Sequence, residues 1–434
     1  MSNLLAMIRH RFVRNVLTLQ AGSFAGNLIQ GFAGIAIARL LQPALFGEYT
    51  LAFGVAGIAA VLVGAGIQDA VSSIIGAAHA RADKELTLDI SAFMIKLTAI
   101  AAAITLCALP FLPRVASALY HDSTIGGYAA IIVLGVILSS LFFAFASLTL
   151  QAGGNIRMLT VLIVFDQLIR YGLSVLFVWQ GWGVAGAVTG HLLGAVLVSI
   201  LAVSFFHNVV ARDDIIPHFS AIFRRLRSVS LVRYLGFTFN VAVDRNISNL
   251  YLVLPVAITG AFVSKTDTGF FKLSFGYINL ALSLLGPISV LLNMEFPRIH
   301  AESKEKLVKN FKRVSLYSIG ISAVLTAGAL LAARLAFLIL YGRTFVPAVT
   351  YVYGLAVYGA LFGIGVGLGP MWRAINKVNI SILINCVVLG LGIPLGIFLV
   401  RQWDVWGAVG MVTIWFTVSH FASFIYLARK LKEI

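Results

Sequence analysis

Six charged residues within the apolar segments of this 434-residue chain are candidates for function. They are Lys96, Asp166, Arg170, Asp244, Arg245 and Lys272. On insertion scales, a charged side chain at the centre of a bilayer costs roughly 2.5–3.5 kcal/mol if it has no partner. Residues of this cost normally face a hydrated cavity or an opposite charge. We therefore expect these six to mark the functional part of the protein.

The cations among these residues suit recognition of a phosphorylated ligand. A guanidinium or ammonium group in a low-dielectric pocket forms charge-assisted hydrogen bonds with phosphate oxygens. Four cations against two carboxylates leave a formal charge of +2, which favours a diphosphate. We add Arg39, because it lies at the mouth of the first apolar segment. The predicted ligands of an anionic headgroup are Arg39, Lys96, Arg170, Arg245 and Lys272.

The two carboxylates, Asp166 and Asp244, are candidates for coupling to H⁺ or Na⁺. A carboxylate inside a membrane can exchange a salt-bridge partner for a small cation. Asp166 and Arg170 are four residues apart, a spacing at which side chains of one helix can pair. Asp244 and Arg245 are adjacent, so they do not face each other and need partners on other helices. The sequence indicates no other cofactor and no metal site.

Each interpretation has a structural alternative. The pair at 166 and 170 either serves function or only makes insertion tolerable. Lys96 and Arg39 either bind substrate or extend toward the membrane interface, where their charged heads reach water. Tyr351 and Tyr358 either stack on sugar rings or pack against neighbouring helices. The glycine-rich run 363–370 is predicted to bend easily or to permit close helix contact.

The elements that position these residues are predicted to be membrane helices. The chain is 60% apolar and 11% charged, and its mean hydropathy is +0.97, whereas a soluble domain is about 45–50% apolar and about 25% charged. A membrane helix needs ~20 apolar residues. The apolar stretches predict an all-α fold with twelve spans, near 16–38, 49–68, 88–112, 127–149, 159–179, 183–206, 232–258, 268–294, 313–340, 347–370, 378–400 and 405–427.

Twelve spans use almost the whole chain, so no room remains for a soluble catalytic domain. The sequence also contains no nucleotide-binding, metalloprotease or serine-hydrolase motif, and we expect no enzyme. The net charge of +16 does not indicate nucleic acid, because the basic residues cluster at the ends of apolar segments. Twenty-two basic residues fall in inner loops and six in outer loops, which predicts that both termini are cytoplasmic.

An internal repeat divides the chain. Residues 120–155 align with residues 341–376 without a gap at an offset of 221, Gly47 aligns with Gly269 at 222, and Trp182 aligns with Trp406 at 224. With six spans in each half, the two copies enter the membrane in the same orientation, as in transporters built from parallel repeats. We predict an N-terminal lobe over 1–206, a cytoplasmic amphipathic linker over 207–231, and a C-terminal lobe over 232–434, with a central cleft between the lobes.

The linker is predicted to contain a helix that lies on the anionic inner leaflet. Such a helix presents one apolar face to the lipid and basic residues to the headgroups. The apolar face would be formed by Phe219, Ile222, Phe223 and Leu226, with Arg224, Arg225 and Arg227 pointing elsewhere.

Segment 37–49, which reads IARLLQPALFGEY, resembles the first outer loop of the polysaccharide and O-antigen flippases, which belong with the multidrug and toxin extrusion transporters. It departs from their pattern at Gln42, where the flippases usually have Gly, and the second-half loop has Thr268-Gly269-Phe270-Phe271 in place of Gly-x-Tyr. Similar short motifs follow along the chain: LQAGGN at 150–155, DR at 244–245, FPR at 296–298 and YGRTF at 341–345.

The resemblance implies a MATE-like flippase in a bacterial inner membrane. Its substrate would be a polyprenyl-diphosphate-linked oligosaccharide for O-antigen or exopolysaccharide biosynthesis, and its further partners would be membrane lipids and the polysaccharide polymerase machinery. One alternative is a cation-coupled multidrug exporter, which would need an acidic or neutral cleft. Another is a peptidoglycan-precursor flippase, which tends to carry two additional spans. A glycosyltransferase or polymerase would expose large outer loops, whereas the outer loops here are short.

Overall fold

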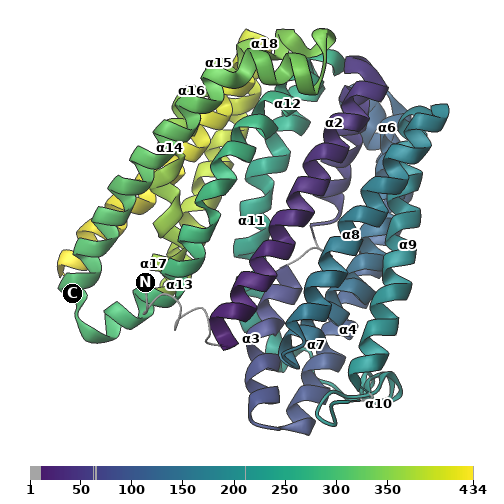
Figure 1. The fold of residues 1–434 in the computed structure, drawn as a ribbon, viewed down its shortest axis with the longest axis vertical. Helices are drawn as coiled ribbons and strands as arrows, with labels where there is room; N and C mark the ends of the chain where they lie inside the picture. The colour runs from purple at the N-terminus through teal and green to yellow at the C-terminus, as the bar shows by residue number, and fades with distance from the viewer. Residues whose placement is uncertain (1–10, 62, 64–65, 211, 434) are drawn as a thin grey trace. The chain divides into compact units, whose positions relative to one another are not determined.

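A computed structural model describes residues 11–61, 63, 66–210 and 212–433, and the elements in these ranges are helices (Figure 1). Residues 1–10 of the predicted N-terminal lobe lie outside the described part. The α-helices are α2 (Arg11–Ala59), α3 (Gly66–Ala80), α4 (Lys84–Ala108), α5 (Leu112–Tyr120), α6 (Ser123–Leu138), α7 (Ala144–Ala152), α8 (Ile156–Phe177), α9 (Gly183–Val210), α10 (Phe219–Arg225), α11 (Val232–Phe262), α12 (Lys265–Leu282), α13 (Gly286–Glu302), α14 (Lys304–Leu340), α15 (Val349–Gly354), α16 (Ala356–Leu361), α17 (Leu368–Ala374) and α18 (Val378–Glu433).

Among the described residues, eight continuous helical stretches are long and apolar enough to cross a membrane, and a bent pair over 343–374 makes nine. Three of the eight contain a break. Helix α2 breaks at Gln42 (φ 61°), the stretch from α8 to α9 breaks at Gly181 (φ 90°), and α18 breaks at Asp404 (φ 48°). Each of these three covers two predicted spans. Divided at their breaks, they bring the total to the twelve spans expected from the sequence.

The glycine-rich run does not form the sharp bend. The 52° bend lies at Leu355, between α15 and α16, whereas Phe362–Gly367 forms a short 3-10 helix. Glycine is needed there for close packing, because a Cβ on Gly363 would overlap the backbone carbonyl of Ser318 in α14. The structure therefore supports the second of the two predicted roles for this run.

The chain forms two compact units. The first contains Met1–Leu41 and Val55–Asn246, and the second contains Gln42–Gly54 and Ile247–Ile434. Residues 207–231 belong to the first unit, and both α2 and α11 are divided between the units. A long helix can pack with different neighbours along its length, and a sequence repeat does not reveal this division.

A residue with positive φ follows a helix at equivalent positions of the sequence repeat. His121 follows α5 with a φ of 55°, and Gly342 follows α14 with a φ of 94°. The two residues are separated by 221 positions, the offset at which 120–155 aligns with 341–376. Both adopt the left-handed region, which suits glycine and strains most other residues. The ψ angles differ, 25° at His121 and 174° at Gly342, so the two turns share a positive φ and not the same geometry.

The core of the first unit is built around α8 and α9, which lie side by side (Figure 1). Gly190 allows α9 to approach the α8 backbone, because a Cβ there would lie 2.6 Å from the Cα of Ser174. The hydroxyl of Ser174 donates to the carbonyl of Ala187 across the same contact, at 2.8 Å. In the second unit, the two arms of α18 pack through the Trp415 indole, which donates to the carbonyl of Gly392 at 2.9 Å.

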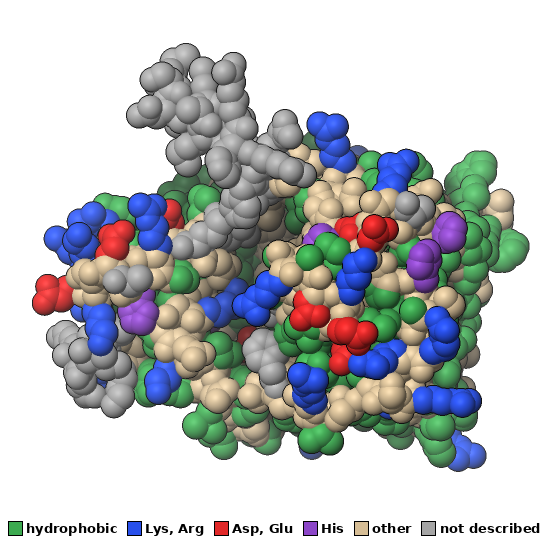
Figure 2. Space-filling model, turned by 90° about the horizontal axis from the view of Figure 1, so that it is seen from below, with side chains coloured by type: hydrophobic (Ala, Val, Ile, Leu, Met, Phe, Trp, Pro, Cys, Tyr) green, Lys and Arg blue, Asp and Glu red, His purple; other side chains and the backbone are tan. Residues whose placement is uncertain are grey.

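The linker is docked on the first unit. Ile222 is fully buried, and the ring of Phe219 packs against Phe206 with centroids 4.3 Å apart. Helix α10 confirms the predicted helix, but most of its apolar face contacts protein rather than lipid, and only Phe223 is largely exposed, at 61%. An amphipathic pattern cannot distinguish these two apolar surroundings. The end of the molecule that carries α10 is covered with charged side chains (Figure 2).

Ion pairs fasten this linker. The Arg225 guanidinium donates to Asp89 at 2.5 Å and to Glu85 at 3.3 Å, both in the first turns of α4. The hydrogen bond to the Asp89 carboxylate raises the pKa of Arg225, which therefore remains charged. His79 at the end of α3 bonds Asp213 with a separation of 2.7 Å. These contacts explain why the linker is part of the first unit.

Candidate functional site

A buried ion pair forms the centre of the candidate site in the first unit. In α8, the Arg170 Nε lies 2.5 Å from the Asp166 Oδ1, and each residue is only 6% exposed. Gln167 donates to the other carboxylate oxygen at 2.8 Å. The Arg170 Nη2 donates to the hydroxyl of Ser139 at 2.6 Å. The predicted pairing of Asp166 with Arg170 is confirmed, and Ser139 is a partner that the sequence did not reveal.

Local backbone features position this pair. Ser139 begins a π-helical turn, Ser139–Phe143, between α6 and α7, and such turns are frequent at functional sites. Its hydroxyl accepts from Arg170 and donates to the carbonyl of Gly135 at 2.7 Å, so it is held in place. On the other side, a Cβ on Gly194 would lie 2.5 Å from the Cα of Arg170. Glycine there lets α9 pack directly against the turn that carries the arginine.

Arg170 lines a cavity of about 210 Å³ that lies wholly within the first unit. A water molecule occupies roughly 30 Å³ of liquid, so the cavity has room for several waters or for one small polar group. Its polar lining comes from α3, α4, the π-helical turn and α8. The lining residues are Val63, Ile67, Gln68, Met94, Thr98, Val136, Ser139, Ser140, Phe143, Ala144 and Arg170.

A second polar contact links α2 to α8. The side-chain amide of Gln30 donates to the hydroxyl of Tyr171 at 2.7 Å. The Tyr171 ring meets His191 of α9 edge to face, with centroids 5.9 Å apart. Among the described residues, no group of three or more His, Cys, Asp or Glu side chains could hold a metal ion. His191 is thus part of an aromatic contact beside the charged pair.

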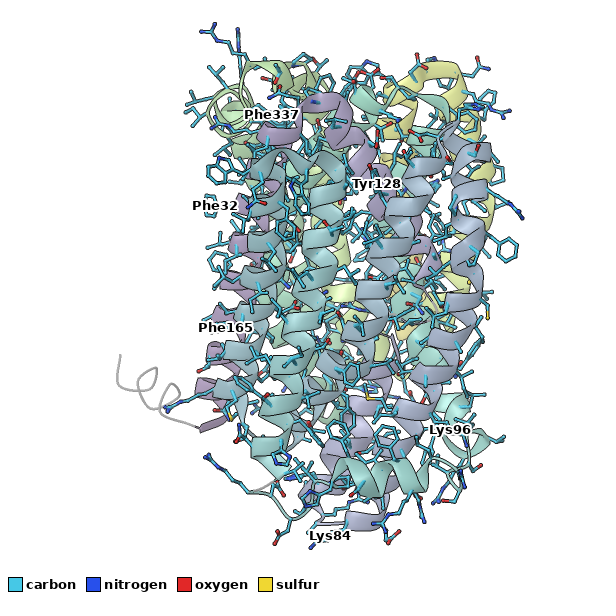
Figure 3. The ribbon with its side chains drawn as sticks, turned by 90° about the vertical axis from the view of Figure 1, so that its right-hand side faces the viewer. Phe32, Lys84, Lys96, Tyr128, Phe165 and Phe337 are labelled. Atoms are coloured by element: carbon cyan, nitrogen blue, oxygen red, sulfur yellow. The ribbon has the colours of Figure 1, made fainter. Side chains whose placement is uncertain are left out.

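Lys96 contacts the linker. Its ammonium group donates to the backbone carbonyl of Val229 at 3.1 Å, and the residue is half-buried. Figure 3 shows Lys96 toward the end of the first unit that also carries Lys84. The cavity beside Arg170 is lined by Met94 and Thr98 of the same helix, and not by Lys96. Its role in headgroup binding stays a prediction.

The remaining predicted residues lie apart from this cavity's lining. Arg39 is exposed near the end of the first arm of α2, Asp244 is half-buried in α11, and Arg245 is exposed. None of these three lacks a partner. Lys272 is exposed on α12, and it alone of the seven predicted residues belongs to the second unit. Of the seven predicted site residues, Asp166 and Arg170 are thus the two that the structure shows in contact with each other.

The two tyrosines considered for sugar stacking have structural contacts in the second unit. Tyr358 is 1% exposed, and its hydroxyl donates to Asn279 at 2.7 Å. Its ring packs against Phe275 and Phe416. Tyr351 meets Trp406 edge to face, with centroids 5.8 Å apart. A ring buried as deeply as Tyr358 has no face left for a sugar, so packing explains it.

The fold defined by these helices is that of the MATE transporters. An inward-facing multidrug resistance MATE family transporter of the MOP superfamily is 17% identical, with a TM-score of 0.79 over 93% of this chain and 94% of that chain. A mutant of the Vibrio cholerae MATE transporter VcmN is 13% identical, with a TM-score of 0.66 over 100% and 99%. The eukaryotic MATE transporter AtDTX14 is 16% identical, with a TM-score of 0.64 over 98% and 99%.

Sequence similarity then gives the family. The polysaccharide biosynthesis protein family matches residues 12–299, and the chain belongs to this family. No curated protein shows significant sequence similarity to it. Family and fold together are those of multi-span membrane transporters, so the resemblance seen in the sequence is confirmed.

Proposed function

We propose that the protein is a flippase for a polyprenyl-diphosphate-linked oligosaccharide in the bacterial inner membrane. It would serve surface polysaccharide biosynthesis, such as O-antigen or exopolysaccharide, and would hand its cargo to the polymerase machinery. The observation that carries the proposal is a buried arginine, Arg170, beside a largely apolar cavity with a few polar lining residues, in a member of the polysaccharide biosynthesis family. An arginine in such surroundings favours a phosphate ligand.

The few polar residues of the cavity lining support binding of a small anionic group. Ser140, Thr98 and Gln68 can donate hydrogen bonds to phosphate oxygens beside the guanidinium of Arg170. The lipid tail of the substrate would remain in the bilayer. Arg39, Lys96, Arg245 and Lys272 complete the proposed set of basic residues.

Coupling to H⁺ or Na⁺ is proposed at Asp166, with Asp244 as the second candidate. The carboxylate of Asp166 is 6% exposed and touches Arg170 and Gln167. A cation that replaces Arg170 at this carboxylate would leave the guanidinium available to the substrate. The predicted spans that lie wholly in the second unit contain no Asp or Glu, which favours coupling in the first unit.

The alternative is a cation-coupled multidrug exporter, since the solved structures of this fold include multidrug transporters. Four cations against two carboxylates within the spans argue against a site for cationic drugs. The second alternative, a peptidoglycan-precursor flippase, is disfavoured because the described helices account for twelve spans and not for two more.

Deletion of the gene tests the proposal. We expect lipid-linked oligosaccharide to accumulate on the inner leaflet and surface polysaccharide to disappear, with both restored by the wild-type gene. Accumulation is measured by the access of a membrane-impermeant glycosidase or lectin to right-side-out and inverted vesicles. Unchanged glycan export, together with new sensitivity to cationic dyes, would instead identify an exporter. An Arg170→Lys variant keeps the charge but loses the two-pronged guanidinium, and we expect it to export less glycan.

A further inference from the structure

Aromatic and acidic side chains gather at one end of the second unit. The start of α12, helix α15 and the break in α18 lie together there (Figure 1). Trp406 follows the break and is 50% exposed. Asp404 is exposed in the break itself, and Tyr351 in α15 and Asp267 in α12 are half-buried. All four residues belong to the second compact unit.

The Trp406 ring is held in place while much of its surface stays open. Tyr351 meets it edge to face, with centroids 5.8 Å apart and ring planes at 71°. Helix α15 supports it as well, because a Cβ on Gly354 would lie 2.6 Å from the ring atom Cζ3. The repeat equivalent of this residue, Trp182, instead stacks on Phe177 with ring planes at 20°. Stacking covers one face of Trp182, whereas the edge-to-face contact leaves the faces of Trp406 available to a ligand.

Two carboxylates accompany this ring. Asp267 and Asp404 both interact electrostatically with the hydroxyl group of Tyr351. The hydroxyl of Ser264 donates to the Asp267 Oδ2 at 2.6 Å, which fixes the direction of that carboxylate. An ionised carboxylate only accepts hydrogen bonds, and it has about four lone-pair sites for them. A ligand at this place must therefore supply hydrogen-bond donors.

The backbone of Asp404 adopts a conformation that favours glycine. Its φ and ψ are 48° and −129°. At the corresponding break between α8 and α9, Gly183 has a φ of 58° and a ψ of −142°. A side chain strains the backbone in this conformation, and strained residues cluster at ligand sites. Glycine would form the turn at lower cost, so the turn alone does not explain an aspartate at position 404.

We propose that Trp406, Tyr351, Asp404 and Asp267 form a binding site for the glycan of the cargo. A pyranose ring presents C–H bonds on its face, and these are attracted to the negative face of an aromatic ring. Its hydroxyls supply the donors that the two carboxylates need. The inference deepens the proposed function, because the ligand is the oligosaccharide of the proposed substrate.

The carboxylates favour a sugar over a lipid headgroup. Exposed tryptophan also anchors membrane proteins at the interface, but the phosphate of a phospholipid offers no hydrogen-bond donor and is repelled by nearby carboxylates. A neutral polyol has neither disadvantage. The charge distribution of the chain predicts that this end of the second unit is outside, so the site would receive the glycan as it leaves the transporter.

Binding of oligosaccharide to the purified full-length protein tests the site. The probe is the oligosaccharide released by mild acid from the lipid-linked pool of the same bacterium. Calorimetry gives its dissociation constant, and saturation-transfer NMR shows which sugar protons contact the protein. Trp406→Ala should weaken binding roughly tenfold, since it removes the stacking surface, and should abolish most of the saturation transfer. The control is Trp182→Ala, which removes a tryptophan of similar exposure, 57%, and should bind like the wild type.

A second variant separates the aspartate's role in binding from its place in the turn. Asp404→Gly restores the residue that the first unit uses at this break, so it should be at least as stable in detergent as the wild type. We expect it to bind the oligosaccharide roughly tenfold more weakly, as for the loss of one hydrogen bond to a charged group. Wild-type affinity in both Trp406→Ala and Asp404→Gly would overturn the proposal and leave Trp406 an interface anchor.

Gene deletion distinguishes a failure of this inference from a failure of the proposed function. If the wild-type protein binds no oligosaccharide, although the deletion strain accumulates lipid-linked oligosaccharide on the inner leaflet, the glycan site is wrong and the flippase stands. If deletion leaves glycan export unchanged, the flippase is wrong. Binding that is lost in Trp406→Ala would even then support a carbohydrate site at this end of the second unit.

Discussion

Removal of one partner of the Asp166–Arg170 pair should separate its structural from its functional role. In Asp166→Asn, the guanidinium of Arg170 stays buried without its carboxylate. Loss of one partner from a buried pair costs about 3–5 kcal/mol. The separation of 2.5 Å and the 6% exposure of both residues place this pair in that class. We therefore expect the thermal stability of this variant in detergent to fall strongly. Fluorescence-detected gel filtration after heating measures this fall.

The chain offers a control pair with the same spacing. Arg298 and Glu302 are also four residues apart on one helix, but they are separated by 3.7 Å and their side chains are 72% and 52% exposed. An exposed pair of this kind contributes about 0.3–0.5 kcal/mol, so Glu302→Gln should melt like the wild type. If Asp166→Asn is as stable as Glu302→Gln, the energetic reasoning about the buried pair is refuted.

A double replacement then distinguishes the two roles. Apolar residues of similar volume often replace a buried ion pair at no cost, or with a gain of about 1–4 kcal/mol. Asp166→Leu with Arg170→Met should therefore fold and insert normally. If the pair binds and couples, this stable variant exports no glycan. Wild-type export by the double variant would leave the pair a purely structural role.

Three further predictions concern other parts of the chain. Gly194→Leu should cost about 1–3 kcal/mol through overpacking against Arg170 and lower export, whereas Gly172→Leu, in open space, should do neither. Arg225→Ala should release the linker from Asp89 and speed tryptic cleavage within 207–231, compared with Arg298→Ala. Trp179 and Trp403 are 71% and 55% exposed at repeat-equivalent turns that are predicted to lie outside. Lipids brominated near the headgroup should quench their fluorescence more than lipids brominated near the chain end, because exposed Trp gathers at the interface.

The helices and the central ion pair were accessible from the sequence for simple reasons. The length of an apolar stretch indicates whether it can form a membrane-spanning helix. A separation of four residues indicates that two side chains on one helix can meet. Asp166 and Arg170 satisfy both conditions, so their contact followed without knowledge of any other helix. The partner Ser139 lies 31 residues away on another element, and nothing in its sequence neighbourhood indicates which way it faces.

The linker illustrates a different limit. Phe219, Ile222 and Phe223 predicted a helix with one apolar face, and α10 confirms the helix. Whether that face meets lipid or protein depends on what lies opposite, and Phe206 and Phe145 supply rings for Phe219. For the same reason, Lys96 was predicted from its cost in the membrane, whereas its contact with the carbonyl of Val229 depends on where the linker runs.

If Asp166 binds the coupling ion as proposed, its pairing with Arg170 predicts a coupling between cation and substrate. While the carboxylate holds the guanidinium, the pair carries no net charge and attracts an anion weakly. A cation at Asp166 would release Arg170, so headgroup and cation should each raise the affinity for the other by the same factor, typically about 5–150-fold.

This linkage is measurable in purified protein. The dissociation constant of a short-chain prenyl diphosphate should fall as Na⁺ increases if sodium is the coupling ion, or as pH decreases if it is the proton. In Asp166→Asn the carboxylate is absent, so the headgroup should bind with an affinity that depends on neither ion. A dependence that survives in Asp166→Asn would move the coupling site elsewhere, and Asp244→Asn would then be the variant to measure. Affinity that is independent of both ions in the wild type would mean that the substrate's own gradient drives export.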